Sequence, residues 1–340
     1  MRRRILALAT AVLLAAAGCT AGHDLRLSRA PAGGPAPEPT TAPTAPAPPT
    51  SPPATLAPLP PLTPAAPGDE VRALVTGTGV VVPVLAPQGE GFLVRTPCAR
   101  EAVIAGGTPL FGATVVLDPG HGGVETGAVG SNGLTEAVVN LAVAERTRDL
   151  LEAAGATVVL TRTADYRVAL GPRAEIATNL APRAFVSIHH NGEADGPSPR
   201  PGTETYFQIA SPQSRRLAGL LYEELVATFS QFEGVPWQAD LDAGAKYRPN
   251  SRGGDYYGIL RRSAGVPAVL SEALFLTNPA EAELLARPEV QQAEAEGIAR
   301  AVARFVTGDD PGSGFVEPYP RTEPAGPGGG TSGCEEPPLE

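Results

Sequence analysis

The distribution of proline is the feature that most constrains this chain. Residues 28–67 hold 15 prolines in 40 positions, interleaved with Ala and Thr and almost free of charged or aromatic residues. Such a segment cannot bury enough apolar surface to form a core. In a fully extended polyproline II conformation it would span roughly 120 Å, at about 3.1 Å per residue. We therefore predict a disordered tether over residues 19–69 and expect the folded part of the chain after it.

The N-terminus has the pattern of an export signal. Three arginines at positions 2–4 precede an uncharged run over residues 5–17, which is followed by Gly18 and Cys19. This run is shorter than the roughly 20 residues that a membrane-spanning helix needs. The ending LAAAGC resembles the lipobox of bacterial lipoproteins, in which the cysteine is acylated and becomes the mature N-terminus. We therefore predict a signal peptide over residues 1–18 and a lipid anchor on Cys19, with a soluble product cut after Ala17 as the alternative.

The cysteines and the net charge limit the location and the partners. Without Cys19, the chain retains Cys98 and Cys334, an even pair that we expect to be bridged in an oxidising compartment; two free thiols are the alternative. The formal charge of -10 is the wrong sign for binding a phosphate backbone, so nucleic acid is excluded as a partner. We predict an extracytoplasmic protein of the cell envelope, anchored to the outer face of the cell membrane and otherwise secreted.

Two smaller segments flank the main folded part. Residues 70–110 contain three or four β-rich runs separated by Gly and Pro turns, which predicts a small β-rich module. A module of about 40 residues is too small for a large core of its own, so we expect it to pack on the larger folded region after residue 110. Residues 308–340 include the run GPGGGTSG and are predicted to form a disordered tail, except where Cys334 holds it.

The pattern changes between residues 111 and 307. Short apolar runs alternate with helical segments, which is typical of an α/β domain with a mostly parallel central sheet flanked by helices. A helix is expected after Thr135, which can cap it, and should stop at Gly155. Further helices are expected near residues 211–228 and 279–306. The expected strands are residues 114–117, 157–160, 184–188, 203–207 and 268–270.

Chemically active side chains follow these predicted strands. His121 comes just after the first strand, His189 and His190 end the third, and Glu272 follows the last almost directly. Glu136 stands at the start of the helix after the first glycine-rich loop. Ligands of open α/β sheets bind outside the carboxyl ends of the strands, so we expect these groups to converge on one edge of the sheet.

The residue types at this edge indicate a metal site. Each alone has an ordinary explanation, such as a loop histidine bonded to backbone or a glutamate that suits a helix dipole. Together, two imidazoles and a carboxylate match the ligand set of a catalytic zinc with one position open for water. A closed structural site of the thiolate type does not fit this set.

Five sequence runs are similar to those of a known family. In this order they resemble the zinc-dependent N-acetylmuramoyl-L-alanine amidases of the amidase-3 family, and the resemblance covers about residues 112–306. It implies that His121, Glu136 and His189 bind one Zn²⁺ per catalytic domain and that Glu272 is the catalytic carboxylate. His190 occupies a position that the family leaves variable and is not assigned to the metal. The runs are VVLDPGHGG, GAVGSNGLTEAVVNLAVAERTRDLLEAAGATVVLTRTADYRVALGPRAEIATN, AFVSIHHN, GTETYF and GILRRSAGVPAVLSEALFLTN.

The resemblance implies a hydrolase with peptidoglycan or muropeptides as substrate. The bond is the amide between N-acetylmuramic acid and L-alanine; zinc activates water and Glu272 acts as the general base. We expect a catalytic domain over residues 111–307 and a monomer. Two alternatives stay open: a catalytically inactive cell-wall-binding protein, and a zinc hydrolase of another peptidoglycan bond, either a peptidase or a deacetylase.

Four further polar residues match the spacing of the same family. They are interpreted as a structural ion-pair network beneath the site, with substrate contact as the alternative. They are Arg162, Asp165, Arg173 and Asn179.

Overall fold

The computed structural model describes residues 58–66, 68–193, 196–232, 243–318, 324 and 330–340. The predicted signal peptide, Cys19 and most of the proline-rich tether lie outside these residues. Among the helices described, none combines the length and the apolar character needed to cross a bilayer.

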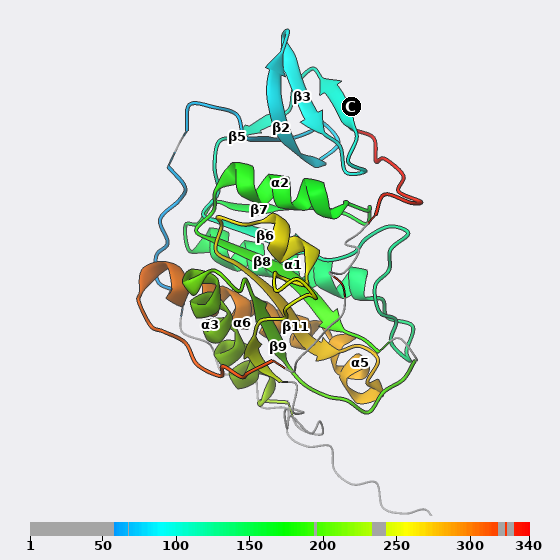
Figure 1. Ribbon diagram of the computed structural model, residues 1–340, viewed down its shortest axis with the longest axis vertical. Helices are drawn as coiled ribbons and strands as arrows, with labels where there is room; N and C mark the ends of the chain where they lie inside the picture. Colours follow the sequence, from blue (N-terminus) through cyan, green and yellow to red (C-terminus); the bar gives the residue numbers. More distant parts are fainter. Residues whose placement is uncertain (1–57, 67, 194–195, 233–242, 319–323, 325–329) are drawn as a thin grey trace, which may run out of the picture. The chain divides into compact units, whose positions relative to one another are not determined.

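The segment predicted to be β-rich forms a five-stranded antiparallel sheet (Figure 1). Its spatial order is β4-β3-β2-β1-β5. The strands are β1 (Ala73–Val75), β2 (Val81–Gln88), β3 (Gly91–Arg95), β4 (Glu101–Ile104) and β5 (Thr108–Leu110). The side chains that fill its own small core are Leu74, Val80, Val82, Val94 and Ile104.

The second sheet has six strands in the order β10-β9-β11-β8-β6-β7. It is mixed, because β9 runs antiparallel to β11 while the other neighbouring pairs are parallel. The expectation of a mostly parallel sheet is corrected in this respect. The described residues between β8 and β9 contain no crossover helix, so β9 returns in the opposite direction. The strands are β6 (Val115–Pro119), β7 (Val158–Leu160), β8 (Ala184–Asn191), β9 (Glu204–Phe207), β10 (Gly244–Lys246) and β11 (Ala268–Phe275).

Helices cover both faces of the six-stranded sheet. One face packs against α1, α3 and α6 in the larger apolar core. The other face is covered by α2, α4 and apolar side chains from β1 and β2, so the two sheets share part of a core. The helices are α1 (Glu136–Ala153), α2 (Leu170–Leu180), α3 (Pro212–Phe229), α4 (Gly258–Arg262), α5 (Pro279–Leu285) and α6 (Pro288–Thr307).

Two details of the helices differ from expectation. Thr135 occupies the N-cap position of α1, but its hydroxyl caps no amide among the described residues. The long helix expected over residues 279–306 is two helices, α5 and α6. Pro288 cannot donate the hydrogen bond that a continuing helix requires, and it starts a new helix instead.

The predicted disulfide is confirmed. Cys98 and Cys334 are bonded across a sequence separation of 236 residues. Close to it, the carboxylate of Glu336 accepts hydrogen bonds from the Thr96 hydroxyl and the Cys98 amide. The described parts of the predicted tail, residues 308–340, therefore include contacts with the five-stranded sheet and its turns.

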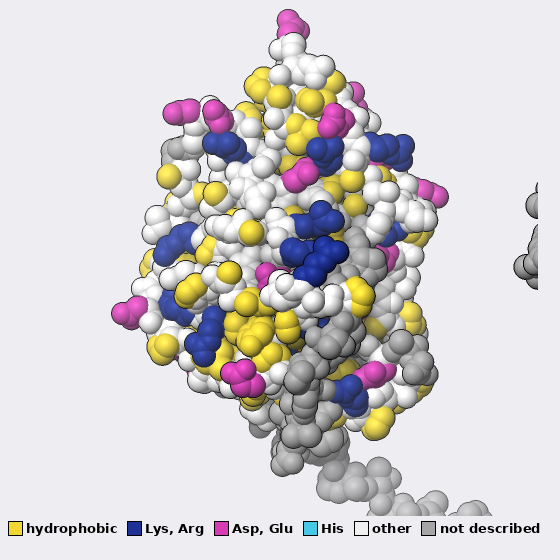
Figure 2. Space-filling model, viewed as in Figure 1, with side chains coloured by type: hydrophobic (Ala, Val, Ile, Leu, Met, Phe, Trp, Pro, Cys, Tyr) yellow, Lys and Arg dark blue, Asp and Glu magenta, His cyan; other side chains and the backbone are white. Residues whose placement is uncertain are grey.

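Charge is unevenly distributed over the molecular surface. Figure 2 shows Lys and Arg side chains gathered near the centre of one face, although the whole chain carries a formal charge of -10. The formal charge of the whole chain therefore does not describe the local electrostatic field at this face.

Candidate active site

The loop after β6 is shaped by the side chains that meet there. His121 adopts a φ of +60°, in the left-handed region. A Cβ on Gly120 would lie 2.2 Å from the Cε1 of His189, and a Cβ on Gly127 would lie 2.4 Å from the Oε2 of Glu136. Real Cβ contacts are not this short, so both glycines are required by the side chains beside them.

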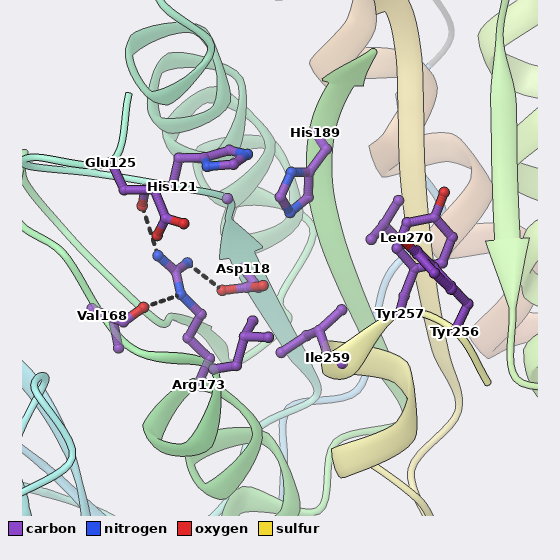
Figure 3. A pocket seen from close by; sticks show the side chains of 13 residues that line it. Asp118, His121, Glu125, Val168, Arg173, His189, Tyr256, Tyr257, Ile259 and Leu270 are labelled. Atoms are coloured by element: carbon purple, nitrogen blue, oxygen red, sulfur yellow. Dashed lines mark hydrogen bonds and ion pairs between the residues drawn. The ribbon is translucent and has the colours of Figure 1, made fainter. Parts of the chain in front are cut away.

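Two buried arginines hold this loop from below. Arg162 donates to the carbonyl of Gly120 at 2.9 Å. Arg173 donates to the carbonyl of His121 at 2.6 Å and to the carboxylate of Asp118 at 2.7 Å (Figure 3). Burial and the neighbouring Arg173 lower the pKa of Arg162 to about 10, which still leaves it a cation at neutral pH. The geometry agrees with the structural network expected for these two arginines.

The other two residues of that expected network lie farther from the loop centre. The carboxylate of Asp165 accepts a hydrogen bond from the Gly123 amide at 2.7 Å. Asn179 donates to the carbonyls of Arg72 and Val84, at 3.2 and 3.0 Å, and so joins α2 to the five-stranded sheet.

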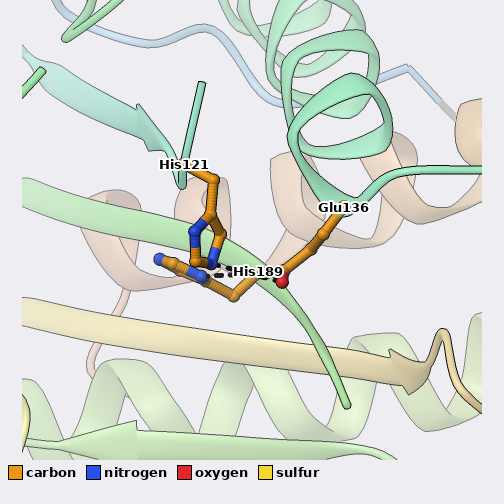
Figure 4. Close-up of side chains that lie close together, drawn as sticks. All are labelled: His121, Glu136 and His189. Carbon is orange, nitrogen blue, oxygen red and sulfur yellow. Dashed lines mark hydrogen bonds and ion pairs between the residues drawn. The ribbon is translucent and has the colours of Figure 1, made fainter. Parts of the chain in front are cut away.

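Three predicted ligand residues come together at the carboxyl edge of the six-stranded sheet. Figure 4 shows the side chains of His121, Glu136 and His189 pointing toward one another. The Nε2 of His121 lies 3.2 Å from Glu136 Oε2, and the Nδ1 of His189 lies 3.0 Å from Glu136 Oε1. One ligand atom from each residue falls within 4.8 Å of the others, so the group could hold a metal ion.

The electrostatics of these three residues suit a divalent cation. Burial alone would raise the pKa of Glu136, but hydrogen bonds from His121 and His189 outweigh it and hold that pKa well below its usual range. Burial lowers the pKa of His189, although the hydrogen bond and the charge of Glu136 act in the opposite direction. An ionised carboxylate and a neutral imidazole are the forms that bind metals.

An unsatisfied atom at the same place supports this fit. The Nδ1 of His121 is buried and has no hydrogen-bond partner among the described residues. Two imidazoles and one carboxylate are a donor set that zinc accepts while a fourth position stays open. The residues present therefore fit a catalytic zinc.

Glu272 lies beside these residues because of strand register. It pairs with His189 on β8 and with Glu204 on β9. Its Oε2 is buried and finds no hydrogen-bond partner in the part of the chain described. Burial, together with the charges of Glu136 and Glu204, raises the pKa of Glu272 well above its usual range. A carboxyl group in this environment is suited to taking up a proton and releasing it.

Two cavities adjoin these side chains. The larger, of about 710 Å³, is lined by the three candidate ligands, by Glu272 and by polar residues that include Asn191 and Arg248. The smaller, of about 200 Å³, has an apolar part formed by Val168, Leu170 and Ile259 (Figure 3). Both cavities share four lining residues: His121, His189, Tyr256 and Tyr257.

Sequence reasoning did not single out several residues in the cleft or beside Glu272. Lys246, the only lysine in the sequence, lies with its Nζ 2.7 Å from the Oε1 of Glu204. The guanidinium of Arg248 lies 3.6 Å from the centre of the Tyr256 ring. The run DYYG before α4 carries two adjacent aromatic residues, Tyr256 and Tyr257. This pair was the sequence feature from which these lining residues of the cleft could have been predicted.

Sequence comparisons with known proteins match this chain to one family. Residues 115–304, more than half of the chain, match the family model described as N-acetylmuramoyl-L-alanine amidase. The chain is 37% identical over 215 residues to the uncharacterized protein YqiI of Bacillus subtilis strain 168, covering 63% of this chain and 92% of that protein. It is 32% identical over 217 residues to the N-acetylmuramoyl-L-alanine amidase AmiA of Escherichia coli K12, covering 56% and 75%.

A solved structure is also similar. Cwp6 from Clostridium difficile aligns with a TM-score of 0.51 and 29% sequence identity. The alignment covers 58% of this chain and 30% of that chain.

Proposed function

Because this chain belongs to the N-acetylmuramoyl-L-alanine amidase family, we propose that it is a zinc hydrolase that cleaves the amide between N-acetylmuramic acid and L-alanine in peptidoglycan. The observation that carries the proposal is the convergence of His121, Glu136 and His189 beside Glu272 at one cavity. The name of AmiA, an N-acetylmuramoyl-L-alanine amidase similar over 56% of this chain, supports the choice of bond.

His121, Glu136 and His189 are the proposed zinc ligands. A bound Zn²⁺ lowers the pKa of a coordinated water toward 7 and polarises an amide carbonyl. The chain contributes an ionised Glu136 and a neutral His189, both favoured by their surroundings. Gly120 and Gly127 leave the space in which the ligand side chains lie.

Glu272 is the proposed general base and acid. Its carboxylate would accept a proton from the attacking water and deliver it to the departing amine nitrogen. The hydroxyl of the water adds to the lactyl carbonyl carbon as the carbon–nitrogen bond breaks. The products are a glycan strand with a free lactyl carboxylate and a stem peptide that begins with the free amine of L-alanine.

The two cavities support a substrate that extends on both sides of the scissile bond. They meet at His121 and His189, next to the proposed metal position. One is lined largely by polar groups and the other has an apolar part, so the two arms of the substrate would meet different surroundings.

We also propose an envelope location for a monomer with a lipid anchor on Cys19. Similar cell-wall amidases and the Cys98–Cys334 disulfide support a compartment outside the cytoplasm. Metabolic labelling with a fatty acid tests the anchor: the label should be incorporated by the wild-type chain and lost in Cys19→Ser. A wild-type chain without label would contradict it.

Mass spectrometry of digested peptidoglycan tests the proposed bond. We expect release of intact stem peptides that begin with a free alanine amine. No release would favour an inactive wall-binding protein, whereas acetate or shortened stems would favour a deacetylase or a peptidase. Dialysis against a chelator should abolish release and added Zn²⁺ should restore it; full activity after exhaustive chelation would contradict the zinc mechanism.

A further inference from the structure

His190 points to the face of the sheet opposite to His189. Adjacent residues of a strand alternate between the two faces, so the second histidine is directed toward α1 and α6. Its side chain is 0% exposed. Its Nδ1 lies 2.8 Å from the Oδ1 of Asn140 on α1, and its Nε2 lies 3.0 Å from the Oε2 of Glu294 on α6.

Asn140 links His190 to the proposed metal ligand Glu136. The Nδ2 of Asn140 donates to the Gly120 carbonyl at 3.2 Å and to Glu136 Oε1 at 3.4 Å. A carbonyl and an ionised carboxylate only accept hydrogen bonds, so the amide nitrogen of Asn140 must face them. Its Oδ1 must then face His190, whose Nδ1 carries the donated proton. The direction of each bond in this part of the chain of contacts is therefore fixed.

His190 also contacts the same carboxylate directly. Its backbone amide lies 3.2 Å from Glu136 Oε1 and donates to it. The carboxylate oxygen that faces His189 is thus held by the backbone of His190 and by the side chain that His190 orients.

The buried charge at Glu294 is expensive for a position that serves packing alone. Its side chain is 0% exposed, and its Oε1 has no hydrogen-bond partner within the described residues. Desolvating a carboxylate costs several kcal/mol, and apolar residues of similar volume often replace a buried ion pair without loss of stability. Its neighbours Val290 and Ile298 on α6 are buried and apolar. The charge therefore points to a role other than packing.

We propose that Glu294, His190 and Asn140 form a positioning chain that fixes the Glu136 carboxylate in the orientation that binds the metal. This inference rests on the proposed function of Glu136 as a ligand. Residues that orient metal ligands from outside the coordination sphere typically change metal affinity 10- to 100-fold. Here the contacts run from Glu294 on α6 through the side chain of His190 on β8 to Asn140 and Glu136 on α1.

The test replaces both members of the buried pair with apolar residues. In the double variant His190→Phe/Glu294→Leu, Zn²⁺ affinity measured by competition with a chromophoric chelator should fall about 10- to 100-fold. The metal-free double variant should remain folded, because no lone charge is left buried. Gln291→Leu, one turn earlier on α6, is the matched control and should leave the affinity within about twofold. Wild-type affinity in a folded double variant overturns the proposal.

Two more variants keep the test decisive. If the double variant does not fold, Glu294→Gln decides: weaker zinc binding supports the positioning chain and unchanged binding overturns it. Asn140→Leu should also weaken binding, and adding it to the double variant should cause little further loss, because linked residues act as a unit. Fully additive losses would contradict the chain.

The outcome for the wild-type protein separates the two proposals. A wild-type chain that neither binds Zn²⁺ nor releases stem peptides would defeat the proposed function. A wild-type chain that does both, with variants that bind zinc equally well, would defeat only the positioning chain.

Discussion

The two sheets of this protein differ in where they keep their charges. The five-stranded sheet has a core of aliphatic side chains, and its ion pair of Arg95 with Glu101 is partly exposed. The six-stranded sheet buries charged groups at its carboxyl edge, among them Asp118, Glu136 and Glu204. Burying a charged group costs stability unless the group has partners. In the six-stranded sheet, the residues of the candidate site therefore also affect the stability of the fold. Substitution of charged residues should therefore cause larger losses of turnover and of unfolding free energy in the six-stranded sheet than in the five-stranded sheet.

The largest effect is expected at Glu272. Glu272→Gln removes the group that would transfer the proton, so turnover on purified peptidoglycan should fall by about 10²- to 10⁴-fold. Zn²⁺ binding should be retained, and thermal stability should not decrease, since burial already disfavours the ionised form. Glu101→Gln in the five-stranded sheet serves as the control with normal turnover. Undiminished turnover of Glu272→Gln would refute the assigned role.

The next effect concerns the buried pair of Asp118 and Arg173. Burial alone would raise the pKa of Asp118, but Arg173 and two hydroxyl groups outweigh it and lower that pKa. Arg173→Met leaves the carboxylate buried without its cation and should reduce the free energy of unfolding by about 3–5 kcal/mol. Arg95→Met in the other sheet breaks two partly exposed ion pairs, with Glu101 and Glu175, and should cost about 0–1 kcal/mol. Urea denaturation measures both, and equal losses would contradict the difference between the sheets.

The raised pKa of Glu281 should make the free energy of unfolding depend on pH. Its carboxylate accepts hydrogen bonds from the amides of Phe275 and Gly202, yet burial raises its pKa from 4.5 to about 7. The folded state holds this proton more tightly than the unfolded state does. The contribution of this group to the free energy of unfolding is complete below pH 4.5. It is lost as the pH rises through 7, by up to about 3 kcal/mol.

Glu281→Gln provides the comparison for that prediction. The free energy of unfolding of the wild type, relative to Glu281→Gln, should decrease between pH 5 and pH 8. A difference that stays constant or increases over this interval would contradict the assignment.

The smallest effect is expected from the disulfide. Cys98→Ser/Cys334→Ser should lower the free energy of unfolding by about 2 kcal/mol, at the low end of the range for disulfides. Hydrogen bonds to the carboxylates of Glu336 and Glu340 continue to hold the C-terminal segment in the folded state. Turnover should stay within about twofold, since the candidate ligands belong to the other sheet and its adjoining segments. A parallel loss of turnover would show that the five-stranded sheet supports the cleft.

Much of the fold could be predicted from strand and helix patterns, and the failures have physical causes. The strand β10 is only Gly–Ala–Lys, which has no apolar run to indicate it. The reversed direction of β9 could have been predicted from the sequence. Residues 192–203 are few and rich in Pro and Gly, whereas a parallel connection needs a longer crossover, usually a helix. The break between α5 and α6 was signalled by Pro288.

The residues of the candidate site could be predicted only in part from the sequence. The ends of the predicted strands brought His121 and His189 to one edge, where the structure also places Glu136. Asn140 stands four residues after Glu136 on one helix face, a spacing that could have identified it. The contact between His190 and Glu294 joins residues 104 positions apart and belongs to no motif, so only the folded chain reveals it.

The guanidinium groups of Arg162 and Arg173 hold carbonyls of the His121 loop through the protein's own hydrogen bonds. A loop that is immobilised in advance loses little conformational entropy when a cation arrives. Removing either guanidinium should therefore make binding of the proposed zinc ion entropically more costly, even while every proposed ligand atom remains in the chain.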